Sequence, residues 1–497
     1  MSEYRKIWDV LVQSMQKYPL SVISCERKTK CQHEAKCQYT YQEFISVVEN
    51  HGRSISALFP AKCKCAIVCK SELYAAMAVL ASWSADLVAI PLSLNYGEKH
   101  CRRIVEHTLP DVLIVDDETD IDGFCEIPTY NIVTGVCSHF RENCDFDTYL
   151  CDAALIMCTS GTTGLPKGAV ITEHGLIANL RAIQKYFCIK SSDTILLARP
   201  IYHSAVLTGE LLIALVNGVN IVFLNDKYTP HMLYDCCTRN QITVLCGTPT
   251  LFRHFCSFLE LKKQKVQLKN IVLSGECLSD RIALLIRGVF PFANIYHVYG
   301  LTEASPRVSY LPPEQFDMSP VSVGVPVWGT QIKIVDEKGE LCRNYEHGDI
   351  MVKSLSLLKG YYKNPELTNC VLKDGWLVTG DIGYQDETGK LYILSRKDDL
   401  IIKAGMNIYP KEVENQVIGL PQIVDCIVYG YINAGIQSIA IDVVLHPAWC
   451  NLTVKDIKVL LAEALPQFQL PTKVSVVDSI ARNASGKVIR NKSNSMY

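Results

Sequence analysis

Apolar runs of two kinds alternate along the first 300 residues, and this alternation restricts the possible folds most. Runs such as 40–58 and 73–85 space their apolar residues three or four apart, which predicts helices. Short continuous runs such as 65–70 and 87–93 predict buried strands. Strands that alternate with helices form sheets covered by helices. We therefore predict an α/β fold of flanked β-sheets.

The pattern changes twice in the second half of the chain. From about residue 323, short strand-like runs lie between turns rich in Gly, Asp and Asn, which predicts a β subdomain over about 323–396. The last hundred residues mix both kinds of run and predict a small α+β domain. Because 497 residues exceed what one core usually supports, we expect an N-terminal domain at 1–396 and a C-terminal domain at 397–497.

Charge and hydropathy exclude several classes of protein. A formal net charge of −2 offers no broad attraction to nucleic acid or to anionic membranes. No apolar run reaches the ~20 residues that cross a bilayer, so we expect no membrane insertion. The first twenty residues carry early charges and lack the apolar stretch of a secretory signal. These features predict a cytoplasmic protein.

The chain contains 22 cysteines, which raises the question of disulfides or a metal site. In the cytoplasm thiols stay reduced. The densest groups lack the CxxC pairs of structural zinc sites. We expect scattered thiols, with a metal site as the alternative. The two groups are Cys31 and Cys37 with His33 between them, and Cys63, Cys65 and Cys69.

The segment 159–168, TSGTTGLPKG, concentrates glycine and hydroxyl residues directly after an apolar run. Glycine permits close backbone approach, and hydroxyl and N–H groups suit phosphate oxygens. The segment is not a P-loop, because Pro166 precedes Lys167 and Gly168 follows it. The next residues are strand-like, so the loop is expected to join two strands. Taken by itself, such a turn is more often an exposed linker.

Four further stretches follow in order: YGLTEAS at 299–305, TGD at 379–381, SRKDDLIIKAGMNIYPKEVE at 395–414, and NASGKVIRNK at 483–492. Together with the loop, they resemble the signature motifs of the adenylate-forming superfamily, which includes acyl-CoA synthetases, aryl acid ligases and nonribosomal adenylation domains. The resemblance runs from about Tyr39 to Lys492. It implies that a carboxylic acid attacks the α-phosphorus of ATP, that pyrophosphate leaves, and that a thiol then displaces AMP.

The resemblance assigns roles around the nucleotide. It implies that Tyr299 stacks on adenine with Gly275 leaving room, that Asp381 and Arg396 bind the ribose, that Thr302 contacts the α-phosphate, and that Glu303 holds Mg²⁺. Taken singly, these charged residues are more typical of caps or solvated surface positions, so the assignments depend on the motifs. The residues expected to cradle the β- and γ-phosphates are Thr159, Ser160, Gly161, Thr162, Thr163, Gly164 and Lys167.

The resemblance also assigns roles in the C-terminal domain. Lys487 matches the catalytic lysine, whose charge bridges carboxylate and phosphate oxygens. On charge alone, Lys487 is typical of a solvated basic tail. Asp398 matches the hinge about which the small domain rotates. Gly405 matches the point where the pantetheine arm passes closely after that rotation.

The acid is expected to bind beside 199–209, RPIYHSAVLTG. Relatives that activate α-amino acids have an aspartate where this chain has Tyr202, His203 and Ser204, so we predict an acid without a free α-amine. His203 is expected to orient the carboxylate, with a packed histidine as the alternative. Cys246 and Gly247 are expected to leave space for an aryl or a short or medium acyl group.

The sequence therefore predicts a Mg²⁺- and ATP-dependent acid–thiol ligase. The acceptor is coenzyme A or the phosphopantetheine of a separate acyl or peptidyl carrier protein. Two alternatives stay open, an adenylate-forming enzyme with a non-thiol acceptor and a nucleotide-binding relative without catalysis.

Overall fold

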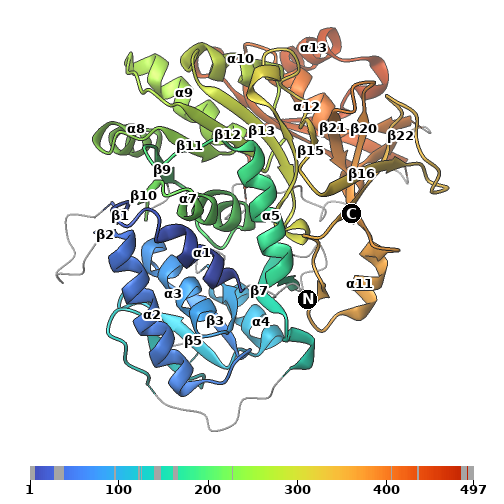
Figure 1. The fold of residues 1–497 in the computed structure, drawn as a ribbon. Helices are drawn as coiled ribbons and strands as arrows, with labels where there is room; N and C mark the ends of the chain where they lie inside the picture. The colour runs from blue at the N-terminus through green and yellow to red at the C-terminus, as the bar shows by residue number, and fades with distance from the viewer. Residues whose placement is uncertain are drawn as a thin grey trace.

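Two large sheets and the helices around them build most of the molecule (Figure 1). The structure is a computed structural model that describes residues 6–26, 38–93, 97–120, 124, 126–138, 147–160, 166–225, 228–403, 406–433, 436–482 and 490. The short helix α1 (Ile7–Met15) begins this part of the chain and packs on the helices between the sheets.

The first sheet has seven strands in the order β18-β8-β7-β4-β3-β5-β6. Its parallel part carries helices on both faces, with α2 (Tyr41–Leu58) and α3 (Glu72–Ser84) on one and α4 (Glu98–Thr108) on the other. Helix α2 begins at a capping box, in which Thr40 and Glu43 bond each other's backbone N–H groups. The strands are β3 (Lys64–Val68), β4 (Val88–Pro91), β5 (Val112–Val115), β6 (Thr129–Asn131), β7 (Ala153–Ser160), β8 (Pro166–Thr172) and β18 (Gly360–Tyr361).

The second sheet has nine strands in the order β15-β14-β13-β12-β11-β9-β10-β1-β2. Its outer face is covered by α8 (Pro230–Arg239), α9 (Pro249–Lys262) and α10 (Asp280–Val289). The strands are β1 (Val22–Cys25), β2 (Gln38–Thr40), β9 (Thr194–Leu197), β10 (Asn220–Phe223), β11 (Val244–Gly247), β12 (Asn270–Ser274), β13 (Asn294–Gly300), β14 (Arg307–Leu311) and β15 (Val325–Pro326).

The two sheets share one core. Helix α5 (Glu173–Tyr186) and the helical stretch 204–216 lie between them, and apolar residues from both sheets belong to one buried cluster. The stretch 204–216 consists of α6 (Ser204–Val206), a π-helical segment (Leu207–Leu212) and α7 (Ile213–Val216). The result is an αβαβα arrangement, in which strand ends from both sheets border the same helices.

A five-stranded antiparallel sheet forms the predicted β subdomain. It consists of β16 (Thr330–Val335), β17 (Gly348–Ser354), β19 (Leu372–Lys373), β20 (Trp376–Gln385) and β21 (Leu391–Arg396), with the short helix α11 (Pro365–Val371) beside β18 and β19. The sheet order is β16-β17-β20-β19, and β21 pairs with β20.

The C-terminal part has a core of its own. A hairpin and a three-stranded sheet with two helices enclose a separate apolar cluster that includes Ile401, Val413, Ile441 and Leu461. The elements are β22 (Ile401–Lys403), β23 (Met406–Ile408), α12 (Pro410–Ile418), β24 (Ile423–Asn433), β25 (Ile436–Leu445), α13 (Val454–Ala464) and β26 (Lys473–Val476). The predicted α/β fold with a small α+β C-terminal domain is confirmed. The boundary expected at residues 396 and 397 falls where β21 ends, and it stays a prediction.

Many of the described cysteines pack as small apolar residues, and others lie on the surface. Cys65, Cys236 and Cys246 are buried, and all the cysteines described are free thiols. No group of three or more potential metal ligands occurs within the described ranges. Cys31, His33 and Cys37 lie outside them.

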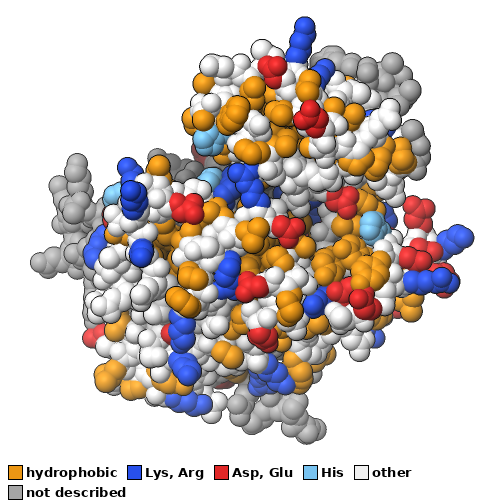
Figure 2. All heavy atoms as spheres, turned by 90° about the horizontal axis from the view of Figure 1, so that it is seen from above, with side chains coloured by type: hydrophobic (Ala, Val, Ile, Leu, Met, Phe, Trp, Pro, Cys, Tyr) orange, Lys and Arg blue, Asp and Glu red, His pale blue; other side chains and the backbone are white. Residues whose placement is uncertain are grey.

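The charges on the surface and the length and polarity of the helices are two further features of the fold. Acidic and basic side chains are interspersed over the face drawn in Figure 2. In the described part of the chain, every helix is too short or too polar to span a bilayer.

Candidate active site

Asp381 lies where three motif residues converge. Tyr299 is the last residue but one of strand β13, and its hydroxyl donates to Asp381 Oδ2 at 2.5 Å. Arg396 Nη1 donates to Asp381 Oδ1 at 2.9 Å, because Asp381 and Arg396 face each other across the β20–β21 ladder. Arg396 also donates to the Thr379 carbonyl at 3.2 Å. Three predicted nucleotide-binding residues therefore form one hydrogen-bonded group.

The electrostatics of this group follow from its burial. Only 6% of Asp381 is exposed. Asp381 raises the pKa of the Arg396 guanidinium, and burial followed by the Asp381 charge raises the pKa of Tyr299. The carboxylate has about four acceptor positions and uses two here, so about two are left for a diol such as that of ribose.

Gly275 lies at the neighbouring strand end. Ser274 of β12 pairs with Val298 of β13, so the next residues, Gly275 and Tyr299, leave their strands side by side. Gly275 has φ +88°, and a Cβ placed there has Thr248 Cγ2 as its nearest neighbour at 3.8 Å. The position beside Gly275 is thus in ordinary contact and not crowded, and the residues fit the base and sugar of a nucleotide.

Glu303 is held by a residue that the sequence reasoning missed. Tyr361 of β18 donates its hydroxyl to Glu303 Oε1 at 2.7 Å, and the Glu303 carbonyl accepts from Leu358 N at 2.8 Å. Tyr361 pairs with Ala169 of β8, two residues after Lys167. Because alternate residues of a strand share a face, Lys167 lies on the same side of β8 as Tyr361. A carboxylate oxygen near a lysine and a phosphate-type loop fits a hydrated Mg²⁺ ion.

The glycine-rich loop joins two strands, as expected. Strands β7 and β8 pair antiparallel, with Thr159 opposite Lys167 and Ser160 opposite Pro166. The backbone of Thr159 and Ser160 thus belongs to β7, and Gly168 packs against Ile156. The remaining loop residues, Gly161, Thr162, Thr163 and Gly164, lie outside the described residues.

Thr302 connects this region to the predicted acid site. Its hydroxyl lies 3.3 Å from Ser204 Oγ, at the start of α6. His203 is the N-cap residue of that helix, and its ring lies 4.3 Å from the ring of Tyr202, centre to centre. The structure therefore brings Thr302, Tyr202 and His203 to one place. Their roles toward an acid stay predictions.

Cys246 and Gly247 end strand β11 in a fully buried position. A Cβ on Gly247 would lie 3.1 Å from Leu251 and from Phe252, so close packing of α9 already explains this glycine. Burial raises the pKa of the Cys246 thiol well above its usual value, Glu210 adds to the rise, and Arg199 and Arg307 oppose it. Cys246 thus lies close to a group of buried charges.

The C-terminal domain contacts the nucleotide side of the large domain. Arg482 donates to Glu276, next to Gly275, at 3.4 Å and to Asp425 at 3.0 Å. The chain is therefore fixed near the site five residues before Lys487. Asp398 lies in the turn between β21 and β22, which suits the predicted hinge. Lys487 and Gly405 lie outside the described residues.

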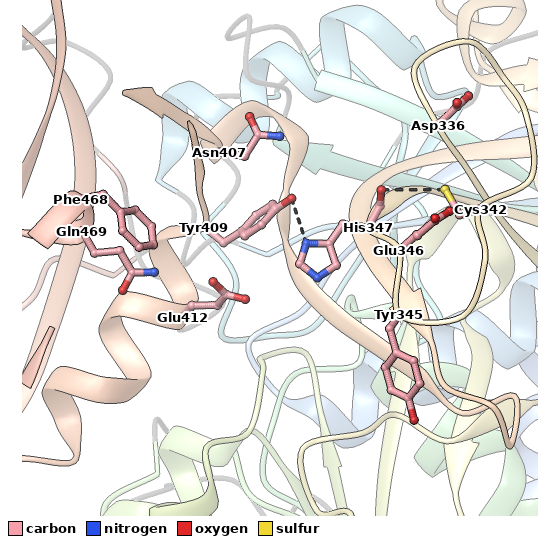
Figure 3. A pocket seen from close by; sticks show the side chains of 10 residues that line it. All are labelled: Asp336, Cys342, Tyr345, Glu346, His347, Asn407, Tyr409, Glu412, Phe468 and Gln469. Carbon is pink, nitrogen blue, oxygen red and sulfur yellow. Dashed lines mark hydrogen bonds between the residues drawn. The ribbon is translucent and has the colours of Figure 1, made fainter. Parts of the chain in front are cut away.

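A separate cavity of 630 Å³ lies between the two domains (Figure 3). Asp336, Tyr345 and His347 line it from the large domain, and Asn407, Tyr409 and Glu412 line it from the small domain. His347 Nδ1 lies 3.3 Å from the Tyr409 hydroxyl. Asn407, Tyr409 and Glu412 lie within the motif at 395–414, but none of the lining residues carries a predicted role toward the nucleotide or the acid, so the cavity is separate from the candidate active site.

The sequence reasoning missed two kinds of residue. Tyr361 holds Glu303 through a strand pairing far away in the sequence. Arg199, Glu210 and Arg307 form a buried charged group, and its only signal was a glutamate inside the apolar run at 209–216.

The fold and these contacts define a nucleotide-dependent, carboxylate-activating enzyme. The family model "AMP-binding enzyme" matches residues 24–362, and the model "AMP-binding enzyme C-terminal domain" matches residues 412–487. The chain belongs to the AMP-binding enzyme family, as the motifs predicted.

Two relatives and one solved structure show which enzymes of this family the chain resembles. The 2-succinylbenzoate–CoA ligase of Bacillus subtilis is 31% identical over 71% of this chain and 71% of its own. A feruloyl-CoA synthase of Amycolatopsis is 29% identical over 70% of each chain. The structure of the O-succinylbenzoate coenzyme A synthetase of Bacillus subtilis with ATP and magnesium superposes with a TM-score of 0.83, at 26% identity over 98% of this chain and 99% of that one. The chain is an acyl-adenylate-forming ligase.

Proposed function

We propose that the protein joins a carboxylic acid without a free α-amine to the thiol of coenzyme A, through an acyl-adenylate. The observation that carries this proposal is the convergence of Tyr299 and Arg396 on Asp381, beside the uncrowded position at Gly275. The relatives are named as CoA ligases of aromatic and fatty acids, and these names support the same chemistry.

In the first step, different residues bind the sugar, the phosphates and the acid. Asp381 and Arg396 hold the sugar, and Lys167 with the backbone of 159–168 binds the outer phosphates. A Mg²⁺ ion bound at Glu303 would neutralise phosphate charge. Thr302 and His203 hold the reacting carboxylate near the α-phosphate, since Thr302 contacts the start of the helix that follows His203. Positioning two anions in this way is the main requirement of phosphoryl chemistry.

Lys487 supplies the positive charge that the meeting of two anions requires. We expect Lys487→Ala to lower acid-dependent ATP–pyrophosphate exchange at least about a hundredfold, because an electrostatic contact in the transition state is lost. Lys492→Ala, in the same basic tail, is the matched control and is expected to keep its activity. Unchanged exchange in Lys487→Ala would remove this mechanism.

The acceptor is tested separately from the activation of the acid. With an acid that supports exchange, coenzyme A is added and the thioester is followed by mass spectrometry. Formation of acyl-CoA supports the proposal. Exchange without acyl-CoA, but with acylation of a pantetheinylated carrier protein, would identify the carrier as the acceptor instead.

A further inference from the structure

Three charged side chains from different strands and helices meet inside the large domain. Arg199 follows β9, Glu210 lies in the π-helical segment, and Arg307 begins β14. Arg199 Nη2 donates to Glu210 Oε1 at 2.5 Å and to Ser274 Oγ at 3.3 Å. Arg307 Nη2 lies against the backbone of Gly209. A Cβ built on Gly209 would lie only 2.5 Å from this nitrogen. We call these three residues the buried charge cluster.

The cluster carries more positive than negative charge. It combines two guanidinium groups with one carboxylate, and Glu210 and Arg307 are 0% and 2% exposed. Within the described residues, Glu210 is the one carboxylate in an ion pair with Arg199, while Arg307 acts on Glu210 at longer range and is hydrogen-bonded with Tyr186. In the same part of the chain, Arg199 Nε, Arg307 Nε and Glu210 Oε2 have no hydrogen-bond partner. A buried charge that is only partly compensated destabilises a protein strongly. The excess positive charge therefore calls for an anion.

The cluster lies at a fixed distance from the predicted reaction site. Glu210 follows His203 by seven residues along the helical stretch 204–216. Arg307 follows Thr302 by five residues. Cys246, which is expected to border the acid, is within electrostatic reach of all three charges. The small residue Gly209 stands directly beside the Arg307 guanidinium.

We propose that the buried charge cluster recognises a second carboxylate at the far end of the acid, so that the substrate class is a dicarboxylic acid. This inference rests on the proposed function. A guanidinium fork matches a carboxylate in shape and charge, and one such anion would balance the cluster. Glu210 orients Arg199 and keeps the net charge low enough to favour a monoanionic group. The same positive excess repels an ammonium group.

The test compares acids that differ only in the far group. Purified full-length protein is assayed for ATP–pyrophosphate exchange with suberic acid, its monomethyl ester and octanoic acid. A second pair is 2-succinylbenzoate and its ester at the alkyl carboxylate. We expect kcat/KM to be at least about a hundredfold higher for each diacid than for its ester, because an ester leaves the guanidinium groups unpaired. Equal or better use of the esters or of octanoic acid would overturn the inference alone. Exchange with none of the acids would overturn the proposed function as well.

Variants locate the recognition. Arg307→Gln is expected to lower the diacid-to-ester ratio at least about tenfold while ATP binding stays unchanged. Glu210→Gln keeps both guanidinium groups and is expected to preserve the preference for diacids. An unchanged ratio in folded Arg307→Gln, or a preference lost in Glu210→Gln alone, would overturn the assignment. Thermal melting verifies that each variant folds. If either variant fails to fold, the diacid-to-ester ratio of the wild-type protein alone tests the proposal.

Discussion

At the scale of single residues, Asp381 holds the nucleotide site together. Its two oxygens accept hydrogen bonds from Tyr299 near the end of strand β13 and from Arg396 at the end of strand β21. Asp381 therefore fixes both side chains before any ligand binds. Such preorganisation spares the cost of ordering these groups during binding.

Replacement of Asp381 tests this role. We expect Asp381→Asn to weaken ATP binding about 10- to 100-fold, because a charged acceptor of the ribose hydroxyls is lost. Isothermal titration calorimetry measures the Kd. Glu387→Gln, an exposed acid-to-amide change on the same hairpin, is expected to leave the Kd unchanged. An Asp381→Asn variant with wild-type affinity would contradict the assignment.

Glu72 provides a pH-dependent prediction. Its carboxylate accepts from Ile201 N at 2.9 Å, and burial raises its pKa from 4.5 to about 7. The folded state therefore holds this proton more tightly than the unfolded state. The stabilisation is fully present below pH 4.5 and is lost as the pH rises through 7, by roughly 1 to 3 kcal/mol.

The comparison uses melting temperatures between pH 5 and pH 8. Relative to wild type, Glu72→Gln is expected to gain stability as the pH rises, because the amide has no proton to lose. Glu98→Gln, an exposed change in the first turn of α4, serves as control and is expected to show a constant difference. A constant difference in Glu72→Gln too would show that this carboxylate does not titrate over the range.

At the scale of elements, the helical stretch 204–216 connects the two ends of the predicted acid site. His203 caps its start, and Glu210 lies in its π-helical segment, where the backbone of Gly209 approaches Arg307. π-Helical turns often occur at functional sites, because they re-aim the side chains of a helix.

Two glycine substitutions in helices are expected to have opposite effects. Gly209→Ala places a methyl group 2.5 Å from Arg307 Nη2, and we expect a loss of about 1–3 kcal/mol from overpacking. Gly288→Ala in α10 has no atom within 4 Å of its new Cβ, and we expect a gain of roughly 0.5–1 kcal/mol. Thermal melting distinguishes the two. A stabilised Gly209→Ala would refute the close contact.

Many elements could be predicted from the sequence, because periodicity reports burial directly. The strands at 65–70 and 87–93 and the helix at 73–85 appear close to where their patterns predict them. The role of Tyr361 could not be predicted, since it depends on a pairing with Ala169 across nearly 200 residues. The buried charge cluster could not be predicted either, because Arg199 and Arg307 look like ordinary loop charges until the fold encloses them. The assignments of Lys487 and Gly405 stay predictions.

At the scale of the whole molecule, charged contacts connect the two domains. Arg253 of α9 donates to the Val424 carbonyl at 2.6 Å and to Asp425 at 3.4 Å, and Arg482 connects Asp425 to Glu276. Ion pairs that reach solvent weaken as salt screens them. The docking of the small domain is therefore expected to depend on ionic strength.

Asp425→Asn tests this contact. We expect hydrogen exchange in 418–425 and at the surface of α9 to become about tenfold faster at low salt, since a loss of ~1.4 kcal/mol changes an equilibrium tenfold. The effect is expected to shrink as salt is added. Asp442→Asn serves as control, because it makes the same change at a carboxylate that accepts a 3.2 Å bond from Tyr429 inside the small domain. Equal exchange in wild type and Asp425→Asn would show that other contacts hold the domains together.

The cavity in Figure 3 depends on the same docking, because half of its wall belongs to each domain. Any rotation that separates Tyr409 from His347 dismantles it. A compound shaped to fill it would bind one orientation of the small domain and, by linkage, would stabilise that orientation. A compound bound in this cavity would then stop the enzyme partway through its cycle, and it would not compete with ATP.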